Sequence, residues 1–158
     1  MPQIVSDIVD VYVFRRRSGT VEFLLLRRAA GVALGGTWQS VHGHVEPGEP
    51  AWRAGLRELR EETGLGPLGF WQLDFVNTFY VASRDAILMC PCFAAEAPPD
   101  AQVKLSTEHT EFAWLATADA LRRFMWPGQR RAVEETVCEI AAHGPAERHL
   151  RIDAADRP

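Results

Sequence analysis

Apolar residues along this chain gather in short runs that polar or glycine-containing segments separate. The runs at residues 8–14 and 21–26 are rich in β-branched, aromatic and leucine residues, a composition that predicts two strands. Ser18-Gly19 lies between the two runs and predicts a turn. Residues 29–37 contain three glycines and show no period, so we expect a loop after the second strand.

A second pair of apolar runs follows in the middle of the chain. Residues 70–81 and 86–93 predict two further strands around a turn at residues 83–85. Because Pro91 lacks the N–H that a ladder hydrogen bond needs, we expect an edge or a bulge at its position. Residues 94–104 contain two consecutive prolines and predict an exposed loop that is too short to separate two domains.

Between the two pairs of strands, the pattern changes to one that predicts a helix. Pro50 suits the first helical position, Glu49 lies at the positively polarised end, and Gly64 stops the run. On a helical wheel at about 100° per residue, one stripe of residues is the expected core contact. This stripe consists of Trp52, Leu56, Leu59 and Thr63.

Three acidic residues occupy a different face of the same helix. Glu58, Glu61 and Glu62 lie within an arc of about 100°, where carboxylates repel one another. A divalent cation would reverse this cost, and Mg²⁺ prefers oxygen ligands such as carboxylates. The residues that share this arc one to two turns earlier are small, which would let another piece of backbone approach: Ala51, Ala54 and Gly55.

Arginines lie close to these acids on the same helix. Arg57 precedes Glu61 by four residues, so it can pair with this acid and orient it. For an arbitrary helix of this composition, a solvated acidic face balanced by arginines is the ordinary interpretation. The helix alone therefore leaves both a metal site and a solvated face open.

The loop before the helix favours the metal site. Five residues separate Gly43 from Glu49, and seven more precede the segment Arg57-Glu58-Leu59-x-Glu61-Glu62-x-Gly64-Leu65. This spacing matches the signature of the Nudix hydrolases at every fixed position, and the chain resembles that family. The resemblance implies an α/β fold, an α/β/α sandwich with a mixed sheet between helices. We expect this domain to cover residues 1–145, and residues 146–158 to form a flexible tail or a small added element.

The resemblance also implies a reaction and its site. Nudix hydrolases cleave a nucleoside diphosphate linked to another group with Mg²⁺ or Mn²⁺, so we expect Mg²⁺ as the cofactor and Mn²⁺ as its alternative. In several Nudix groups a Glu in a later loop approaches the metal or accepts a proton from the attacking water. Carried over to this chain, the resemblance implies that the metal ligands are the Gly43 carbonyl, Glu58, Glu61 and Glu62. It also implies that Arg57 positions a Glu. Glu108 is the expected base or a further metal ligand, with Glu111 as the alternative base.

Residues before the signature are candidate substrate contacts. In Nudix proteins an Arg after such a Leu-rich strand often faces the substrate phosphates, so Arg27 and Arg28 are candidates, with a plain surface strand end as the alternative. Trp38 would stack on a base or pterin ring, or would lie in the core. His42 and His44 border the expected metal, where a histidine would donate to a phosphate or form ordinary loop hydrogen bonds.

The residues around the start of the signature narrow the resemblance. Many Nudix proteins have Leu-Pro-Gly-Gly where this chain has Val41-His42-Gly43-His44. Together with Trp38-Gln39-Ser40-Val41, this departure resembles a branch that includes the bacterial dihydroneopterin triphosphate pyrophosphatase, which also hydrolyses dATP. We therefore expect a pyrophosphohydrolase that cleaves a nucleoside triphosphate or pterin triphosphate to the monophosphate and pyrophosphate. The alternatives are a hydrolase of dinucleoside polyphosphates or ADP-linked compounds, and a Nudix domain that senses nucleotides without cleaving them.

Charge and cysteine content limit the partners. The net charge of −4 argues against a dedicated nucleic-acid binder and against an RNA cap-removing enzyme, both of which show more basic surface. Cys90, Cys92 and Cys138 form no disulfide framework and predict reduced thiols in a cytoplasmic protein. No signal peptide or long apolar run is visible, so no membrane partner is expected. Because Nudix domains commonly pair, a homodimer is a possible arrangement.

Two helices are predicted near the end of the chain. Thr117 suits the N-cap of a helix over residues 118–124, and Pro127 suits the start of the last helix. Gly144-Pro145 ends that helix. Its apolar residues repeat at helical spacing and predict a core-facing stripe: Val133, Val137, Ile140 and Ala141.

Overall fold

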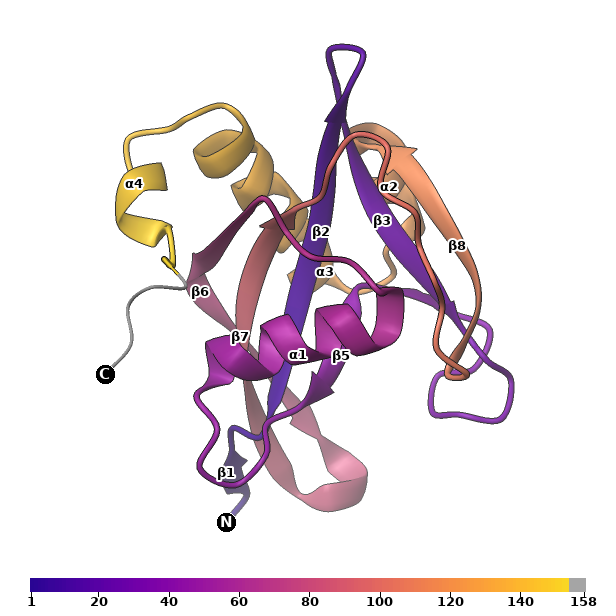
Figure 1. Cartoon of the computed structure of the whole chain (residues 1–158). Coiled ribbons are helices and arrows are strands. Elements are labelled where there is room, and N and C mark those ends of the chain that lie inside the picture. Colours follow the sequence, from indigo (N-terminus) through magenta and orange to yellow (C-terminus); the bar gives the residue numbers. More distant parts are fainter. Residues whose placement is uncertain (154–158) are drawn as a thin grey trace.

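The computed structural model describes residues 1–153, which form a mixed β-sheet with helices on both faces (Figure 1). The α/β sandwich that the sequence predicted is confirmed. Within these residues the strands are β1 (Gln3–Val5), β2 (Ile8–Arg17), β3 (Thr20–Arg28), β4 (Trp38–Gln39), β5 (Val41–His44), β6 (Gly69–Val81), β7 (Ala86–Glu96) and β8 (His109–Ala116). The helices are α1 (Ala51–Thr63), α2 (Thr117–Arg123), α3 (Pro127–Glu135) and α4 (Glu147–Leu150), with a 3₁₀ turn at Ala82–Arg84 and a π-helical turn at Thr136–Ala141.

Strand β2 lies at the centre of the sheet. It pairs antiparallel with β3 and β5 and parallel with β7. Strand β3 also pairs with β4 and β8, and β7 also pairs with β1 and β6. Since successive side chains of a strand point to opposite faces, Val9 and Val11 pack with α1, while Tyr12 and Phe14 pack with α2 and α3.

The small residues of α1 bring this helix close to the sheet. A Cβ on Gly55 would lie 3.2 Å from Val11 Cγ2 and 3.3 Å from Phe70 Cζ. At Gly55, the close neighbours are therefore side chains of the sheet. The expected stripe of larger residues contacts the core: Leu59 and Thr63 are buried, and the half-buried Trp52 and Leu56 pack against the same core cluster as Leu59.

The two ends of α1 lie close to their predicted positions. The helix begins one residue later than expected, because Pro50 has an extended backbone and occupies the N-cap. Gly64 ends the helix as predicted. Its φ of 71° is a left-handed value that glycine tolerates, and its N–H donates to the Arg60 carbonyl at 2.8 Å.

Strands β6 and β7 form a long hairpin that contains the predicted irregularity. Pro91 is opposite Val76, at the end of a register shift that begins at Gln72. The bulge expected near this proline is therefore present. Strand β7 continues to Glu96, three residues beyond its predicted end, because its last part pairs with β2.

The helices of the C-terminal part differ in detail from the prediction. Ala116 occupies the N-cap of α2, and the Thr117 hydroxyl instead donates to the Val21 carbonyl at 3.3 Å. Helix α3 begins at Pro127 as predicted. The π-helical turn after α3 changes the period, so that Val133 and Ile140 are buried but Val137 and Ala141 are half-buried.

Residues 147–152 belong to the segment expected as a C-terminal tail, and they pack against β6. Helix α4 buries Leu150, the Ile152 N–H donates to the Phe70 carbonyl at 2.8 Å, and Arg151 forms a bridge with Trp71. The rest of the expected tail, residues 154–158, lies outside the described residues. Among residues 1–153, no helix has the length and apolarity needed to cross a membrane.

Candidate active site

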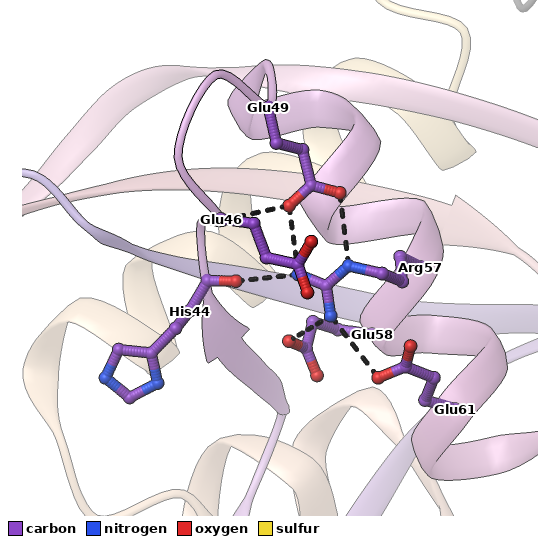
Figure 2. A network of polar contacts seen from close by, with 6 residues as sticks. All are labelled: His44, Glu46, Glu49, Arg57, Glu58 and Glu61. Carbon is purple, nitrogen blue, oxygen red and sulfur yellow. Dashed lines mark hydrogen bonds and ion pairs between the residues drawn. The ribbon is translucent and has the colours of Figure 1, made fainter.

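A network of polar contacts joins the loop after β5 to the middle of α1 (Figure 2). Arg57 Nε and Nη2 donate to the two Glu49 oxygens at 3.1 and 3.0 Å, and Nη2 also donates to the His44 carbonyl at 2.8 Å. Arg57 Nη1 donates to Glu58 Oε1 at 2.7 Å and to Glu61 Oε2 at 3.3 Å. One planar guanidinium group thus fixes the loop and orients two of the three acids.

The charges of this network reinforce one another. The hydrogen bond to Glu49 is the largest cause of a raised pKa at Arg57, and the hydrogen bond to Glu58 adds to it. The same bond from Arg57, followed by one from the Glu46 backbone, lowers the pKa of Glu49. Both partners therefore remain ionised at neutral pH, and the loop is held to the helix by a charge-assisted contact.

The three acids of α1 differ in their surroundings. The side chain of Glu61 is 59% exposed, that of Glu58 is 14% exposed and that of Glu62 is 4% exposed. Burial, followed by the charges of Glu58 and Glu108, raises the pKa of Glu62 to about 9. Glu62 Oε2 is buried and has no hydrogen-bond partner among the described residues. Since a buried polar atom without a partner is costly, this carboxyl requires either a proton or a cation.

Strand β5 brings the backbone of Gly43 against the acidic face of α1. A Cβ at Gly43 would collide with the carboxyl group of Glu58, so the approach depends on glycine. The pairing of Gly43 with Val9 of β2 fixes this position in the sheet. A backbone carbonyl together with three carboxylates would make an oxygen-only donor set, which fits a hard cation such as Mg²⁺. The structure thus places Gly43 against Glu58, and the metal-ligand roles of Gly43, Glu58, Glu61 and Glu62 remain predictions.

We expect Gly43→Ala to weaken Mn²⁺ binding about 10- to 100-fold, the loss typical when a residue that orients a metal ligand is changed. The added methyl group would displace the Glu58 carboxyl from its place beside β5. Mn²⁺ affinity is measured from the loss of the free-ion signal in electron paramagnetic resonance. Gly31→Ala is the matched control, because a Cβ there meets no atom within 4 Å. Equal Mn²⁺ affinities in the two folded variants would contradict the placement of Glu58 at the metal.

A loop distant in sequence packs against the C-terminal end of α1. The N–H of Lys104 donates to the Thr63 carbonyl at 2.8 Å, and the N–H of Ser106 donates to the Glu62 carbonyl at 3.2 Å. Glu108 follows in this loop with an exposed side chain, and its charge raises the pKa of Glu62. Its carboxylate is therefore close enough to act on the buried acid.

The structure separates Glu108 from the alternative base, Glu111. Arg27 Nη1 donates to Glu111 Oε1 at 2.9 Å, so Glu111 is engaged in an ion pair between β3 and β8. His109, which the sequence analysis did not assign, is buried with Nε2 only 3.9 Å from Glu62 Oε2. Burial, followed by the charge of Arg28, lowers the pKa of His109, so the ring is neutral at the base of the site. Its position directly after Glu108 was the one signal for it in the sequence.

Of the expected substrate contacts, Arg28 and the backbone of His42 both act on Glu62. The charge of Arg28 lowers the pKa of Glu62, and its Nε donates to the Ala33 carbonyl at 2.7 Å. The half-buried Trp38 packs against the core cluster of α2 and α3, and the guanidinium carbon of Arg123 lies 5.2 Å from its ring centroid. Among the described residues, no hydrogen bond or ion pair joins Trp38 or Arg27 to the three acids. The structure therefore does not bring these two expected substrate contacts to the acids.

His42 lies next to Gly43 and contacts a buried acid that the sequence analysis missed. Its Nδ1 is 2.7 Å from Asp10 Oδ1, between β5 and β2. Burial lowers the pKa of His42, but the hydrogen bond and the charge of Asp10 outweigh it and leave the pKa raised. Because the register of the two strands creates this pair, no local spacing in the sequence indicates it.

Comparison with known families agrees with this arrangement. A family model described as the NUDIX domain matches residues 6–136. The chain belongs to the Nudix family. It is a hydrolase that acts on phosphoric anhydrides, as the sequence predicted. Nudix hydrolases generally use divalent metals such as Mg²⁺, and relatives of this protein bind nucleotide-like substrates.

The relatives differ in how much of their length this Nudix protein covers. The asymmetrical bis(5′-nucleosyl)-tetraphosphatase of Sus scrofa is 31% identical over 144 residues, 82% of this chain and 94% of that protein. An octanoyltransferase of Myxococcus xanthus is 36% identical over 128 residues, 80% of this chain but only 35% of that protein, so the chain spans about a third of it. These relatives are not named for the dihydroneopterin triphosphate branch suggested by residues 38–44.

Solved structures support the Nudix fold. The crystal structure of a Caenorhabditis elegans Ap4A hydrolase binary complex matches with a TM-score of 0.72 and 24% sequence identity. The match covers 87% of this chain and 98% of that chain. The sheet and the flanking helices are therefore shared over nearly the whole of the compared protein.

Proposed function

We propose that this Nudix protein is a Mg²⁺-dependent hydrolase of dinucleoside polyphosphates. The observation that carries the metal-dependent chemistry is Glu62, a buried carboxyl with an unpartnered oxygen beside Glu58 and Glu108. The identity with a bis(5′-nucleosyl)-tetraphosphatase over 94% of that protein supports this substrate class. All three acids of α1 are present, which favours catalysis over nucleotide sensing.

When bound, Mg²⁺ would neutralise phosphate charge and lower the pKa of the attacking water. Gly43, through its carbonyl, and the three acids Glu58, Glu61 and Glu62 would hold this ion. Mn²⁺ is the expected substitute, since it also takes oxygen ligands. Arg57 keeps Glu58 and Glu61 oriented whether or not substrate is present, because it is tied to the loop by Glu49.

The remaining residues supply proton transfer and phosphate binding. Glu108 accepts a proton from water as the oxygen attacks phosphorus, a new P–O bond forms, and the bridging P–O bond breaks with its electrons leaving on the departing phosphate. Glu108 is favoured over Glu111 because Arg27 already occupies Glu111. Arg28, close enough to alter the pKa of Glu62, presents a guanidinium suited to phosphate oxygens.

A second candidate is cleavage of a nucleoside triphosphate or pterin triphosphate to the monophosphate and pyrophosphate. The segment Trp38-Gln39-Ser40-Val41 favours it through the resemblance described above. The packing of Trp38 against the core beside Arg123 favours a structural role over ring stacking, which weakens this candidate. His42, whose ring contacts Asp10, favours neither substrate.

A substrate panel in ¹⁸O-labelled water tests the proposed function. Purified protein with Mg²⁺ is supplied with dinucleoside tetraphosphates, nucleoside triphosphates, dihydroneopterin triphosphate and ADP-ribose, and the products are identified by mass spectrometry. We expect the highest kcat/KM on dinucleoside tetraphosphates, with one labelled phosphate per cleavage. A preference for triphosphates would select the second candidate. Absence of cleavage throughout, or equal turnover by Glu61→Gln, would reject the hydrolytic site.

Arg57→Lys is expected to lower kcat/KM about 10- to 100-fold on the best substrate of that panel. Lysine keeps the positive charge but lacks the planar fork that contacts Glu49, Glu58 and Glu61 together. Arg53→Lys on the exposed side of the same helix is the control and should keep its activity. Equal losses in the two variants would show that a general effect on α1, and not the fork, is responsible.

A further inference from the structure

Metal-ligating side chains gather on the other face of the sheet from α1. Asp10 of β2, His42 of β5 and Cys90 of β7 each place one ligand atom so that all three atoms lie within 4.8 Å of one another. The register explains this grouping, because Asp10 is opposite His42 on one side and opposite Cys92 on the other. Cys90 is two residues from Cys92, so both point to the same face of β7.

The burial of these three residues suits a bound ion. Asp10 is 8% exposed and Cys90 is fully buried, whereas the side chain of His42 is 35% exposed. The two inner ligand atoms are thus shielded from water, while the imidazole marks the side from which an ion enters. Backbone positions fixed by a central sheet also hold the ligands more firmly than a loop would.

The donor types differ from those of the site on α1. A thiol, an imidazole and a carboxylate together match Zn²⁺, whereas an oxygen-only set matches Mg²⁺. We propose that Asp10, His42 and Cys90 form a binding site for a thiophilic divalent cation, Zn²⁺, separate from the acids of α1. Binding of Zn²⁺ here does not depend on which anhydride the protein cleaves.

The distances allow the ion to be accommodated by small side-chain movements. Zn²⁺ bonds of about 2.0–2.3 Å place tetrahedral ligand atoms about 3.3–3.8 Å apart. The hydrogen bond of 2.7 Å between His42 Nδ1 and Asp10 Oδ1 must therefore open, while the wider separations in the cluster close. Cys90 releases its thiol proton to solvent on binding, and a water molecule reaching the cluster past His42 takes the fourth position.

The position of His42 links this cation to turnover. His42 directly precedes Gly43, the residue whose carbonyl is proposed to hold Mg²⁺. An ion that captures the His42 ring on one face of β5 would shift the backbone that serves the other site. Bound Zn²⁺ is thus expected to inhibit hydrolysis at saturating Mg²⁺, a consequence that rests on the proposed function.

Co²⁺ gives a direct test, because a thiolate ligand produces a charge-transfer absorption that oxygen ligands do not. Reduced, EDTA-stripped protein is titrated with Co²⁺ in saturating Mg²⁺. We expect the absorption to saturate at one ion per chain and to vanish on adding Zn²⁺. It should be lost in Cys90→Ser and kept in Cys138→Ser, which changes an exposed thiol, and in Glu61→Gln. No absorption in the wild type, or its persistence in Cys90→Ser, would overturn the proposal.

Zn²⁺ affinity, measured by competition with a chromogenic chelator, provides a second readout. Losing even an outer partner of a metal weakens binding about 10- to 100-fold, so Asp10→Asn should lose at least about tenfold relative to Cys138→Ser. X-ray absorption of the Zn²⁺-loaded wild type keeps the test decisive if the core variants fail to fold. One sulfur in the first coordination shell is expected, and none would overturn the proposal.

Discussion

Glu62→Gln is expected to reduce turnover about 1,000-fold while leaving the protein folded. A metal ligand that acts on the transition state contributes several kcal/mol, and about 4 kcal/mol corresponds to this factor. The amide keeps the shape of the buried side chain but cannot supply a negative charge to the ion. Steady-state kinetics on the best substrate of the panel and Mn²⁺ titration by electron paramagnetic resonance measure the two effects.

Glu134→Gln supplies the matched control for this variant, because it makes the same chemical change at an exposed position of α3. Its turnover and Mn²⁺ affinity should equal those of the wild type. If Glu62→Gln also retained both, Glu62 would not be a metal ligand, even if the protein proved to be a hydrolase. If it lost turnover but bound Mn²⁺ normally, the role of Glu62 would lie in the chemical step.

In EDTA, the wild type is expected to lose about 3 kcal/mol of stability between pH 6 and pH 8 relative to Glu62→Gln. Burial, then Glu58 and Glu108, raises the folded-state pKa of Glu62 from 4.5 to about 9. The folded protein therefore keeps a proton that the unfolded chain releases above about pH 4.5. This contribution is fully present below that pH and is lost as the pH rises towards 9, at about 1.4 kcal/mol for each pH unit.

Urea unfolding at the two pH values, for both proteins, measures this difference directly. The titrations of groups distant from Glu62 occur in both proteins and cancel in the comparison. Saturating Mg²⁺ should remove the extra pH dependence of the wild type, because the ion stabilises the ionised carboxylate. Parallel stability profiles in EDTA would mean that Glu62 is ionised in the folded protein without metal.

The sequence predicted best those features that depend on neighbouring residues. Helix α1 and its end at Gly64 follow from a periodic pattern and a stop signal. The contact of Arg57 with Glu61 follows from their spacing of one helical turn. The packing of α1 was harder to predict, since the close approach of Gly55 to Val11 and Phe70 depends on side chains from distant strands.

Contacts between residues that are distant in the sequence could not be predicted from local sequence patterns. Asp10 meets His42 only through the register of β2 and β5, and His109 reaches Glu62 only because the preceding turn folds onto α1. The short segment around Leu150 looked like a tail for the same reason. Its polar composition hides a single buried leucine and the contact of Arg151 with Trp71.

The backbone N–H groups of Lys104 and Ser106 donate hydrogen bonds to the last turn of α1. The loop that carries Glu108 and the helix that carries the three acids are therefore held in one fixed arrangement. A chimera that imported this loop from another Nudix protein would alter the setting of Glu62 along with that of Glu108. Substrate choice and ion affinity would then change together.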